Sequence, residues 1–286
     1  MNGGGMGEML IDRGFVRIEE GLVHYRRLAG EGHPLMMFHP SPNSSRGLVP
    51  IMQALRQAGC NADMLALDTL GNGDSAAPRA DLDAPGIEYF GDAMARVMDS
   101  LGLDAVDLYG MHTGARIACE VAQRRPDRVR RVVFRGISDF DEATRNARLE
   151  HYAPECDYDD YGRQFVWAFN FVRDQALHSP YFKRDPEHRL TNRAVPDAAD
   201  LHARAMDVLK NLTSYHKPYR AAFAYRTTDR IVNVTAPSLF VKSAGDPPHI
   251  AAAASELAAL LPQASVAEIS GALHEEASAV ARFLNG

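Results

Sequence analysis

The 286-residue chain is 46% hydrophobic and 24% charged, and it carries a formal net charge of −6. This length is enough for one large domain, and the acidic balance excludes the basic face that nucleic-acid binding requires. No apolar run approaches the ~20 residues that a membrane span needs. Three scattered cysteines and an N-terminal stretch without a signal pattern predict a reducing compartment, so we expect a cytoplasmic protein.

Short apolar runs alternate with helix-like segments over the first half of the chain. A hairpin is predicted first, with strands at 15–20 and 22–29 around a Glu20-Gly21 turn. Four strand-like runs follow, and the first of them is continuously apolar, which is typical of a strand covered on both faces in a parallel sheet. They lie at 34–38, 64–68, 106–109 and 129–135, and helical spacing of apolar residues separates them at 48–59, 90–101 and 117–126.

The pattern changes after this half. From 139 to 234 no clear apolar strand appears, and the segments are rich in aromatic residues and arginine. A stretch of this length is too long for a connecting loop in a compact domain, so it predicts an inserted helical subdomain. Strands resume at 237–242 and 265–269. We therefore predict an α/β core at 1–138 and 235–286 and a helical subdomain at 139–234.

A turn with glycines at both ends joins the strand at 106–109 to the next helix. Gly110 to Gly114 has the form G-x-S-x-G, except that His112 occupies the position of the serine. This motif places a nucleophile on a strained strand-to-helix turn at the top of a parallel sheet. The glycines are needed because the turn crowds its neighbours. The sequence therefore predicts the scaffold of a nucleophile elbow without its usual nucleophile.

Five segments resemble motifs of the α/β-hydrolase superfamily, in the family's order, over nearly the whole chain. They are an oxyanion segment at His39-Pro40-Ser41-Pro42, a D-x-x-G-x-G-x-S loop at Asp68 to Ser75, the elbow, an acid position at Gly245-Asp246 and a histidine loop at Gly271 to His274. The resemblance implies an α/β-hydrolase fold, a mostly parallel eight-stranded sheet flanked by helices, with the inserted segment as a cap. It also implies an enzyme that acts on a small carbonyl compound, by hydrolysis of an ester, lactone, amide or C–C bond or by a related lyase or isomerase reaction.

The resemblance assigns roles to single residues. His274 would be the general base, and Asp246 would hold its imidazole in one tautomer. The backbone N–H groups of Ser41 and Thr113 would bind the developing oxyanion. Pro40 lacks an N–H, but the expected donor is the residue after it.

His112 leaves four interpretations open. Its neutral imidazole could attack an acyl carbon and form an acyl-imidazole. His112 and His274 could instead act as an acid–base pair, since an unperturbed imidazole titrates near neutral pH. The site could be inactive, and the fold could serve as a small-molecule binding protein. His39, His112 and His274 could also converge with Asp246 on zinc or iron, although no close-spaced ligand motif supports this.

Other residues are candidates for the pocket. We expect His39 and Trp167 to contact the substrate, with Trp167 as an aromatic ring of the cap that lines the pocket. Asp139 or Asp141 offers an alternative acid position. One arginine could reach inward and hold a substrate carboxylate with two hydrogen bonds. The candidates for this role are Arg145, Arg148, Arg163 and Arg173.

No cofactor is implied by the sequence. The glycines of Gly71-Asn72-Gly73 lie in a loop and lack the third glycine of a dinucleotide-binding motif. In the preferred interpretations the site also needs no metal. We expect a small-molecule substrate and neither nucleic acid nor membrane as a partner, and we leave the formation of a homodimer open.

Overall fold

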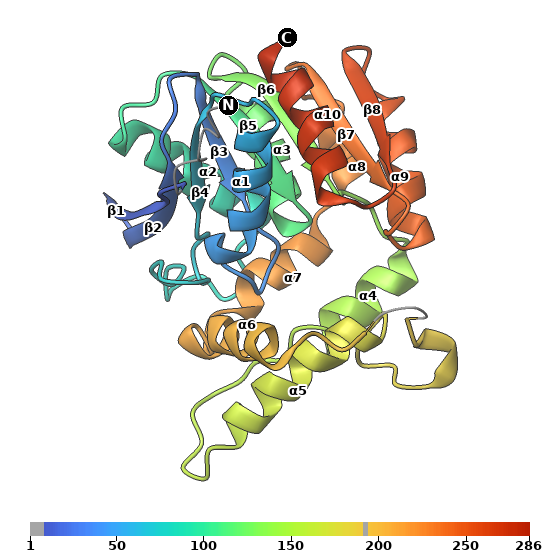
Figure 1. The fold of residues 1–286 in the computed structure, drawn as a ribbon. Helices are drawn as coiled ribbons and strands as arrows, with labels where there is room; N and C mark the ends of the chain where they lie inside the picture. The colour runs from blue at the N-terminus through green and yellow to red at the C-terminus, as the bar shows by residue number, and fades with distance from the viewer. Residues whose placement is uncertain (1–8, 191–193) are drawn as a thin grey trace, which may run out of the picture.

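The computed structural model describes residues 9–190 and 194–286. Within these residues, eight strands form one sheet in the order β1-β2-β4-β3-β5-β6-β7-β8 (Figure 1). The β1-β2 hairpin is antiparallel and β2 runs antiparallel to β4, whereas the other neighbours are parallel. The predicted fold class, a mostly parallel eight-stranded sheet flanked by helices, is confirmed. The strands are β1 (Asp12–Ile18), β2 (Gly21–Leu28), β3 (Pro34–Phe38), β4 (Asp63–Leu67), β5 (Val106–Met111), β6 (Val129–Arg135), β7 (Ser238–Ser243) and β8 (Ala264–Ile269).

Helices cover both faces of the sheet. The flanking helices are α1 (Val49–Gln57) and α10 (Leu273–Asn285) on one face and α2 (Ile87–Ser100), α3 (Thr113–Arg124) and α9 (Pro248–Ala258) on the other. Successive side chains of a strand point to opposite faces. In β3, Leu35 and Met37 accordingly join the apolar cluster of α1 and α10, and Met36 and Phe38 join the cluster of α2, α3 and α9. No helix formed by the described residues is long and apolar enough to cross a membrane.

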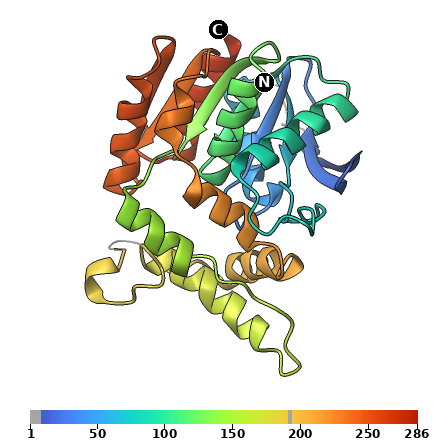
Figure 2. The same ribbon diagram turned by 180° about the vertical axis from the view of Figure 1, so that it is seen from behind.

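The segment between β6 and β7 carries the helices α4 (Glu142–His151), α5 (Arg163–Leu177), α6 (Ala198–Lys210), α7 (His216–Ala224) and α8 (Thr227–Ile231). Figures 1 and 2 show α4, α5 and α6 beyond one edge of the sheet layer. Of these, α5 and α6 enclose an apolar cluster of their own, with Phe171, Tyr181 and Tyr215 among its buried rings. In contrast, α7 and α8 contact α3, and Tyr225 and Ile231 belong to the apolar cluster on the face of the sheet that α2, α3 and α9 cover. The last part of the insertion is therefore packed as part of the core.

Candidate active site

His112 occupies a strained position directly after β5. Its φ of 49° and ψ of −105° are unfavourable for any residue with a Cβ, and no other non-glycine residue among those described has a positive φ. α3 begins at the next residue, and the tight turn places the first turn of α3 in close contact with β3. A Cβ on Gly114 would lie 2.2 Å from the carbonyl oxygen of Phe38, so this position requires glycine. The geometry is that of a nucleophile elbow with His112 at its apex.

The His112 ring is held in one orientation by the chain after β6. Its Nδ1 lies 3.1 Å from the carbonyl oxygen of Gly136. A carbonyl oxygen only accepts hydrogen bonds, so Nδ1 carries the proton and Nε2 carries a lone pair. Gly136 has a φ of 68°, and a Cβ there would lie 2.5 Å from Cε1 of the ring. Glycine at this position therefore makes room for the imidazole.

His112 is neutral at physiological pH. Burial is the largest cause that lowers its pKa, and the positive charges of Arg135 and Arg116 lower the pKa further, to about 4. The charge of Asp246 and the Gly136 carbonyl act in the opposite direction and are outweighed. The protein environment thus keeps a lone pair on the ring and opposes the formation of imidazolium.

Arg135, the last residue of β6, joins the half-buried carboxylate of Asp246 and the buried carboxylate of Glu276. Its Nη1 lies 2.5 Å from Oδ2 of Asp246, and its Nε lies 3.3 Å from Oε2 of Glu276. The hydroxyl of Tyr109 donates to Oε1 of Glu276 at 2.6 Å. Burial alone would lower the pKa of Arg135, but the hydrogen bond to Asp246 and the charges of both acids raise it above its ordinary value. Asp246 is therefore committed to an ion pair.

The structure does not bring His274 to His112. His274 is exposed in the first turn of α10, where it lines a hollow along β8 together with Ser278 and Arg282. α10 begins at Leu273 and its buried face begins only at Glu276. The expected meeting of the two imidazoles is therefore wrong. Asp246, which was expected to orient His274, pairs with Arg135 instead.

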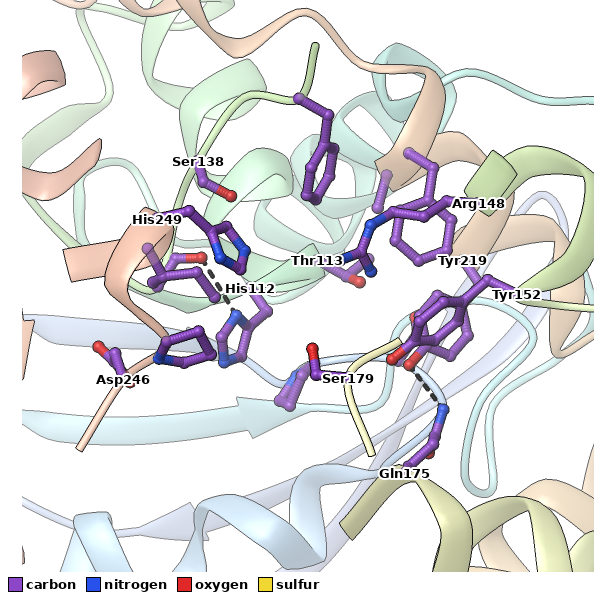
Figure 3. Close-up of a pocket in the computed structure, with 18 of the residues that line it drawn as sticks. His112, Thr113, Ser138, Arg148, Tyr152, Gln175, Ser179, Tyr219, Asp246 and His249 are labelled. Atoms are coloured by element: carbon purple, nitrogen blue, oxygen red, sulfur yellow. Dashed lines mark hydrogen bonds between the residues drawn. The ribbon is translucent and has the colours of Figure 1, made fainter. Parts of the chain in front are cut away.

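A cavity of about 280 Å³ lies between the elbow and the inserted helices (Figure 3). This volume is near the lower end of the range of roughly 300–1,000 Å³ that is usual for small-molecule sites. Its lining from the core includes Ser41, His112, Thr113, Arg116, Ser138, Asp246 and His249, and its lining from the insertion includes Phe140, Arg148, Tyr152, Gln175, Ser179, Tyr219 and Phe223. The cavity therefore lies where the strands β5, β6 and β7 end, as in other open α/β sheets.

Ser41 and Thr113 both line this cavity. Within the described part of the chain, neither of their backbone N–H groups donates a hydrogen bond to a protein acceptor. Thr113 is also the first residue of α3, where the helix dipole places partial positive charge. Two free N–H groups in a cavity can bind the negative charge that develops on a carbonyl oxygen.

His39 and Trp167 do not line the cavity. His39 is fully buried beneath it, where its Nδ1 lies 2.9 Å from the Pro40 carbonyl oxygen and its Nε2 accepts from the Thr69 backbone N–H at 3.1 Å. Both ring nitrogens are therefore used by the backbone, and burial lowers the pKa of the ring. Trp167 stacks on Phe171 within the aromatic cluster of the inserted helices, with ring centroids 5.0 Å apart. The expectation that these two residues contact substrate is wrong.

The alternative acids also have structural partners. Asp139 accepts from Arg145 at 2.6 Å and from the Thr228 backbone N–H at 3.1 Å. Asp141 caps α4 by accepting from the backbone N–H of Thr144. Neither carboxylate lines the cavity next to His112.

A metal site at His112 is not formed. Neither the buried His39 nor the exposed His274 shares the cavity with His112 and Asp246, so the expected ligand set does not converge. Among the described residues, one group of metal-ligating side chains does converge, and it consists of His24, Asp68 and Asp74. Its atoms already have partners, since His24 Nε2 accepts from Arg13 and Lys210 contacts Asp74. The donor set is therefore filled by protein groups.

The sequence did not single out His249, Tyr219 or Gln175. His249 is an exposed residue that follows Asp246 in the chain after β7, and Figure 3 shows its ring on the same side of the cavity as His112. Partial burial of its ring and the charge of Arg148 lower its pKa. Its position shortly after Asp246, at the start of α9, was the one available signal. Tyr219 and Gln175 come from the insertion, where no motif marks them.

Known proteins resemble the chain in sequence. A family profile described as alpha/beta hydrolase fold matches residues 33–275. A haloalkane dehalogenase from Agrobacterium fabrum is 32% identical over 126 residues, which are 44% of this chain and 38% of that protein. A 2-hydroxymuconate semialdehyde hydrolase from Pseudomonas sp. (strain CF600) is 33% identical over 108 residues, which are 38% of each protein. The chain thus matches less than half the length of these curated relatives.

Solved structures resemble the chain over nearly its whole length. An epoxide hydrolase from an endophytic Streptomyces has a TM-score of 0.74 and 19% identity, with 98% of this chain and 96% of that chain covered. An enol-lactonase from Burkholderia xenovorans LB400 has a TM-score of 0.67 and 18% identity, with 96% and 100% covered. At this level of identity the likeness concerns the fold alone.

Proposed function

Because the chain belongs to the α/β-hydrolase fold family, we propose that it is an enzyme that acts on a small carbonyl compound through Nε2 of His112. The bond that is cleaved is an ester, lactone or amide bond, or a C–C bond next to the carbonyl. The observation that carries this proposal is the state of the His112 ring. It is neutral, it is fixed by its Nδ1 proton on Gly136, and it lies at the apex of a strained elbow in a cavity.

An imidazole at the elbow does not need the partners that a serine needs. A serine hydroxyl must lose a proton to a neighbouring base before it becomes a strong nucleophile. Here His274 is exposed outside the cavity and Asp246 is paired with Arg135. Neutral imidazole already has a lone pair at Nε2, so it can attack without a base.

In the proposed step, Nε2 bonds to the carbonyl carbon and the π electron pair moves onto the oxygen. The backbone N–H groups of Ser41 and Thr113 bind this oxyanion. Its collapse expels the leaving group with its bonding electrons and gives an acyl-imidazolium. Water then adds to the acyl carbon, one of its protons passes to the expelled leaving group, and the carboxylic acid and neutral His112 are released. Arg135 and Arg116 disfavour a positive ring, which lowers the nucleophilicity of Nε2 but also shortens the lifetime of the acylated ring.

Both curated relatives are named for cleavage reactions, and one of them is a hydrolase named for a semialdehyde. The semialdehyde in the second name supports a carbonyl compound as the substrate class, whereas the first relative is named for a haloalkane. Each match covers 38% of the relative's length, so the specific reactions of these proteins are not transferred to the chain.

The test is turnover of a panel of small esters, lactones and 1,3-diketones by the wild type and by His112→Gln. We expect turnover by the wild type and a loss of at least about 1,000-fold in the variant, which lacks the attacking lone pair. Rapid acid quench followed by peptide mass spectrometry should find the acyl mass on the peptide that contains His112.

His274→Ala is the matched control, because it removes an exposed imidazole outside the cavity. It should keep full activity. Equal turnover by the wild type and His112→Gln would contradict the proposal. Loss of turnover in His274→Ala would contradict it as well. Binding without product by the wild type would favour the alternative of an inactive small-molecule binding protein.

A further inference from the structure

We propose that the substrate carries a carboxylate and that Arg148 binds it, so that the ligand of this cavity is a small carboxylic acid with a second carbonyl group. The assignment of the second carbonyl rests on the function proposed for His112. The binding of the carboxylate is carried by Arg148 itself and can be measured without turnover.

Arg148 differs from the other arginines that the sequence singled out. Arg145 pairs with Asp139 at 2.6 Å, Arg163 with Asp159 at 3.7 Å and Arg173 with Asp174 at 3.0 Å. Arg148 lines the cavity, and no carboxylate within the described ranges lies within 4.0 Å of it. Arg148 is half-buried, and the part of its charge that is withdrawn from water is costly unless a ligand supplies a negative charge.

Aromatic rings surround the Arg148 guanidinium. Its central carbon lies 4.7 Å from the centroid of Phe140, 5.2 Å from that of Tyr152 and 5.6 Å from that of Phe223. Its Nε is buried and has no hydrogen-bond partner among the described groups. The rings cover the guanidinium, and one of its N–H groups hydrogen-bonds the Tyr152 side chain, so the buried Nε–H and the remaining N–H groups are left for another group. A planar carboxylate fits such an edge through two parallel hydrogen bonds.

The charge of the cavity wall favours an anion. Among the described residues that line the cavity, Asp246 is the one acid, and it pairs with Arg135, which it shares with Glu276. Arg116 also lines the cavity, where it donates to the carbonyl oxygens of Ser138 at 2.6 Å and His112 at 3.2 Å rather than to a carboxylate. Two arginines without carboxylate partners therefore make the wall positive.

The positions of these groups define the ligand. In Figure 3, His112 lies between Asp246 on one side and Arg148, Tyr152 and Tyr219 on the other. The Gln175 side-chain amide donates to the Tyr219 hydroxyl at 3.0 Å and fixes that ring beside Arg148. A carboxylate at Arg148 thus leaves a different carbon of the same small molecule at Nε2 of His112.

The experiment compares carboxylates with their neutral amides by isothermal titration calorimetry. The probes are benzoate, phenylacetate and levulinate, each paired with its primary amide. For the wild type we expect at least one carboxylate to bind at least about 10-fold more tightly than its amide, as a charge-assisted bidentate contact predicts. In Arg148→Met the preference for the carboxylate should disappear. In Arg148→Lys this preference should fall at least severalfold, because lysine keeps the positive charge but cannot make two parallel hydrogen bonds.

Arg163→Met is the matched control, because its guanidinium lies on α5 away from the cavity lining. It should retain the preference, and so should His112→Gln. Retention in His112→Gln together with an absence of turnover in the wild type would remove the proposed reaction and keep the carboxylate site. If no carboxylate binds the wild type, if acid and amide bind equally, or if folded Arg148→Met or Arg148→Lys keeps the full preference, the carboxylate site is refuted.

Discussion

Replacing His112 by glutamine should remove a pH-dependent part of the protein's stability. Burial, Arg135 and Arg116 lower the pKa of His112 from its ordinary value of 6.5 to about 4. Between these pH values the unfolded chain binds a proton at this residue and the folded chain does not, so the free energy of unfolding falls as the pH is lowered from 6.5 to 4. At 1.36 kcal/mol for each pH unit, the loss attributable to His112 is about 3 kcal/mol. Below pH 4 both states are protonated and this contribution stays constant.

The assay is urea unfolding of the wild type and His112→Gln at intervals from pH 4 to pH 7.5. The buried His39 and His216 have lowered pKa values too, but both proteins contain them, so their effect cancels in the difference. We expect the wild type to gain about 3 kcal/mol relative to the variant as the pH rises through this window. A difference that does not change with pH would show that His112 ionises normally in the fold, and it would refute the neutral-imidazole account.

Three further predictions concern the residues around the ring. Gly136→Ala should lower kcat/KM about 100-fold, because the added Cβ would displace the His112 ring from its productive position; an unchanged value would contradict the packing. Tyr109→Phe should lower the free energy of unfolding by about 1–3 kcal/mol in urea, since a buried oxygen of Glu276 loses its donor. His112→Ser should be inactive towards p-nitrophenyl acetate, because the exposed His274 is not available as a base. Ester hydrolysis by that variant would show that another base reaches the elbow.

The fold was predictable because its signals are local. The continuous apolar run at 34–38 predicted a strand covered on both faces, and β3 has Leu35 and Met37 in one cluster and Met36 and Phe38 in the other. The glycines around His112 predicted the tight turn that the backbone makes there. In each case the information lies within a few consecutive residues, where periodicity and steric limits act directly.

The partners of His112 were less predictable, because they depend on contacts between distant segments. Asp246 and Arg135 are 111 residues apart, and the alternating valines and arginines of β6 gave no sign that its last arginine would face an acid after β7. His274 fits a catalytic loop by spacing alone. Its exposure follows from the start of α10 at Leu273, and the exact start of a helix is a weak inference from sequence. Trp167 packs by ring stacking on another residue of the insertion and does not line the cavity.

The ion pair between Arg135 and Asp246 gives the histidine at the elbow a physical rationale. An unpaired Asp246 would raise the pKa of His112, since it already acts in that direction in the presence of Arg135. A protonated ring has no lone pair at Nε2 and could neither attack a carbonyl carbon nor accept a proton from water. The positive charge of Arg135 acts against Asp246 and is the larger of the two effects on the ring. In a serine enzyme the acid of the site must support a protonated imidazole, whereas here the same position is neutralised so that an imidazole stays unprotonated.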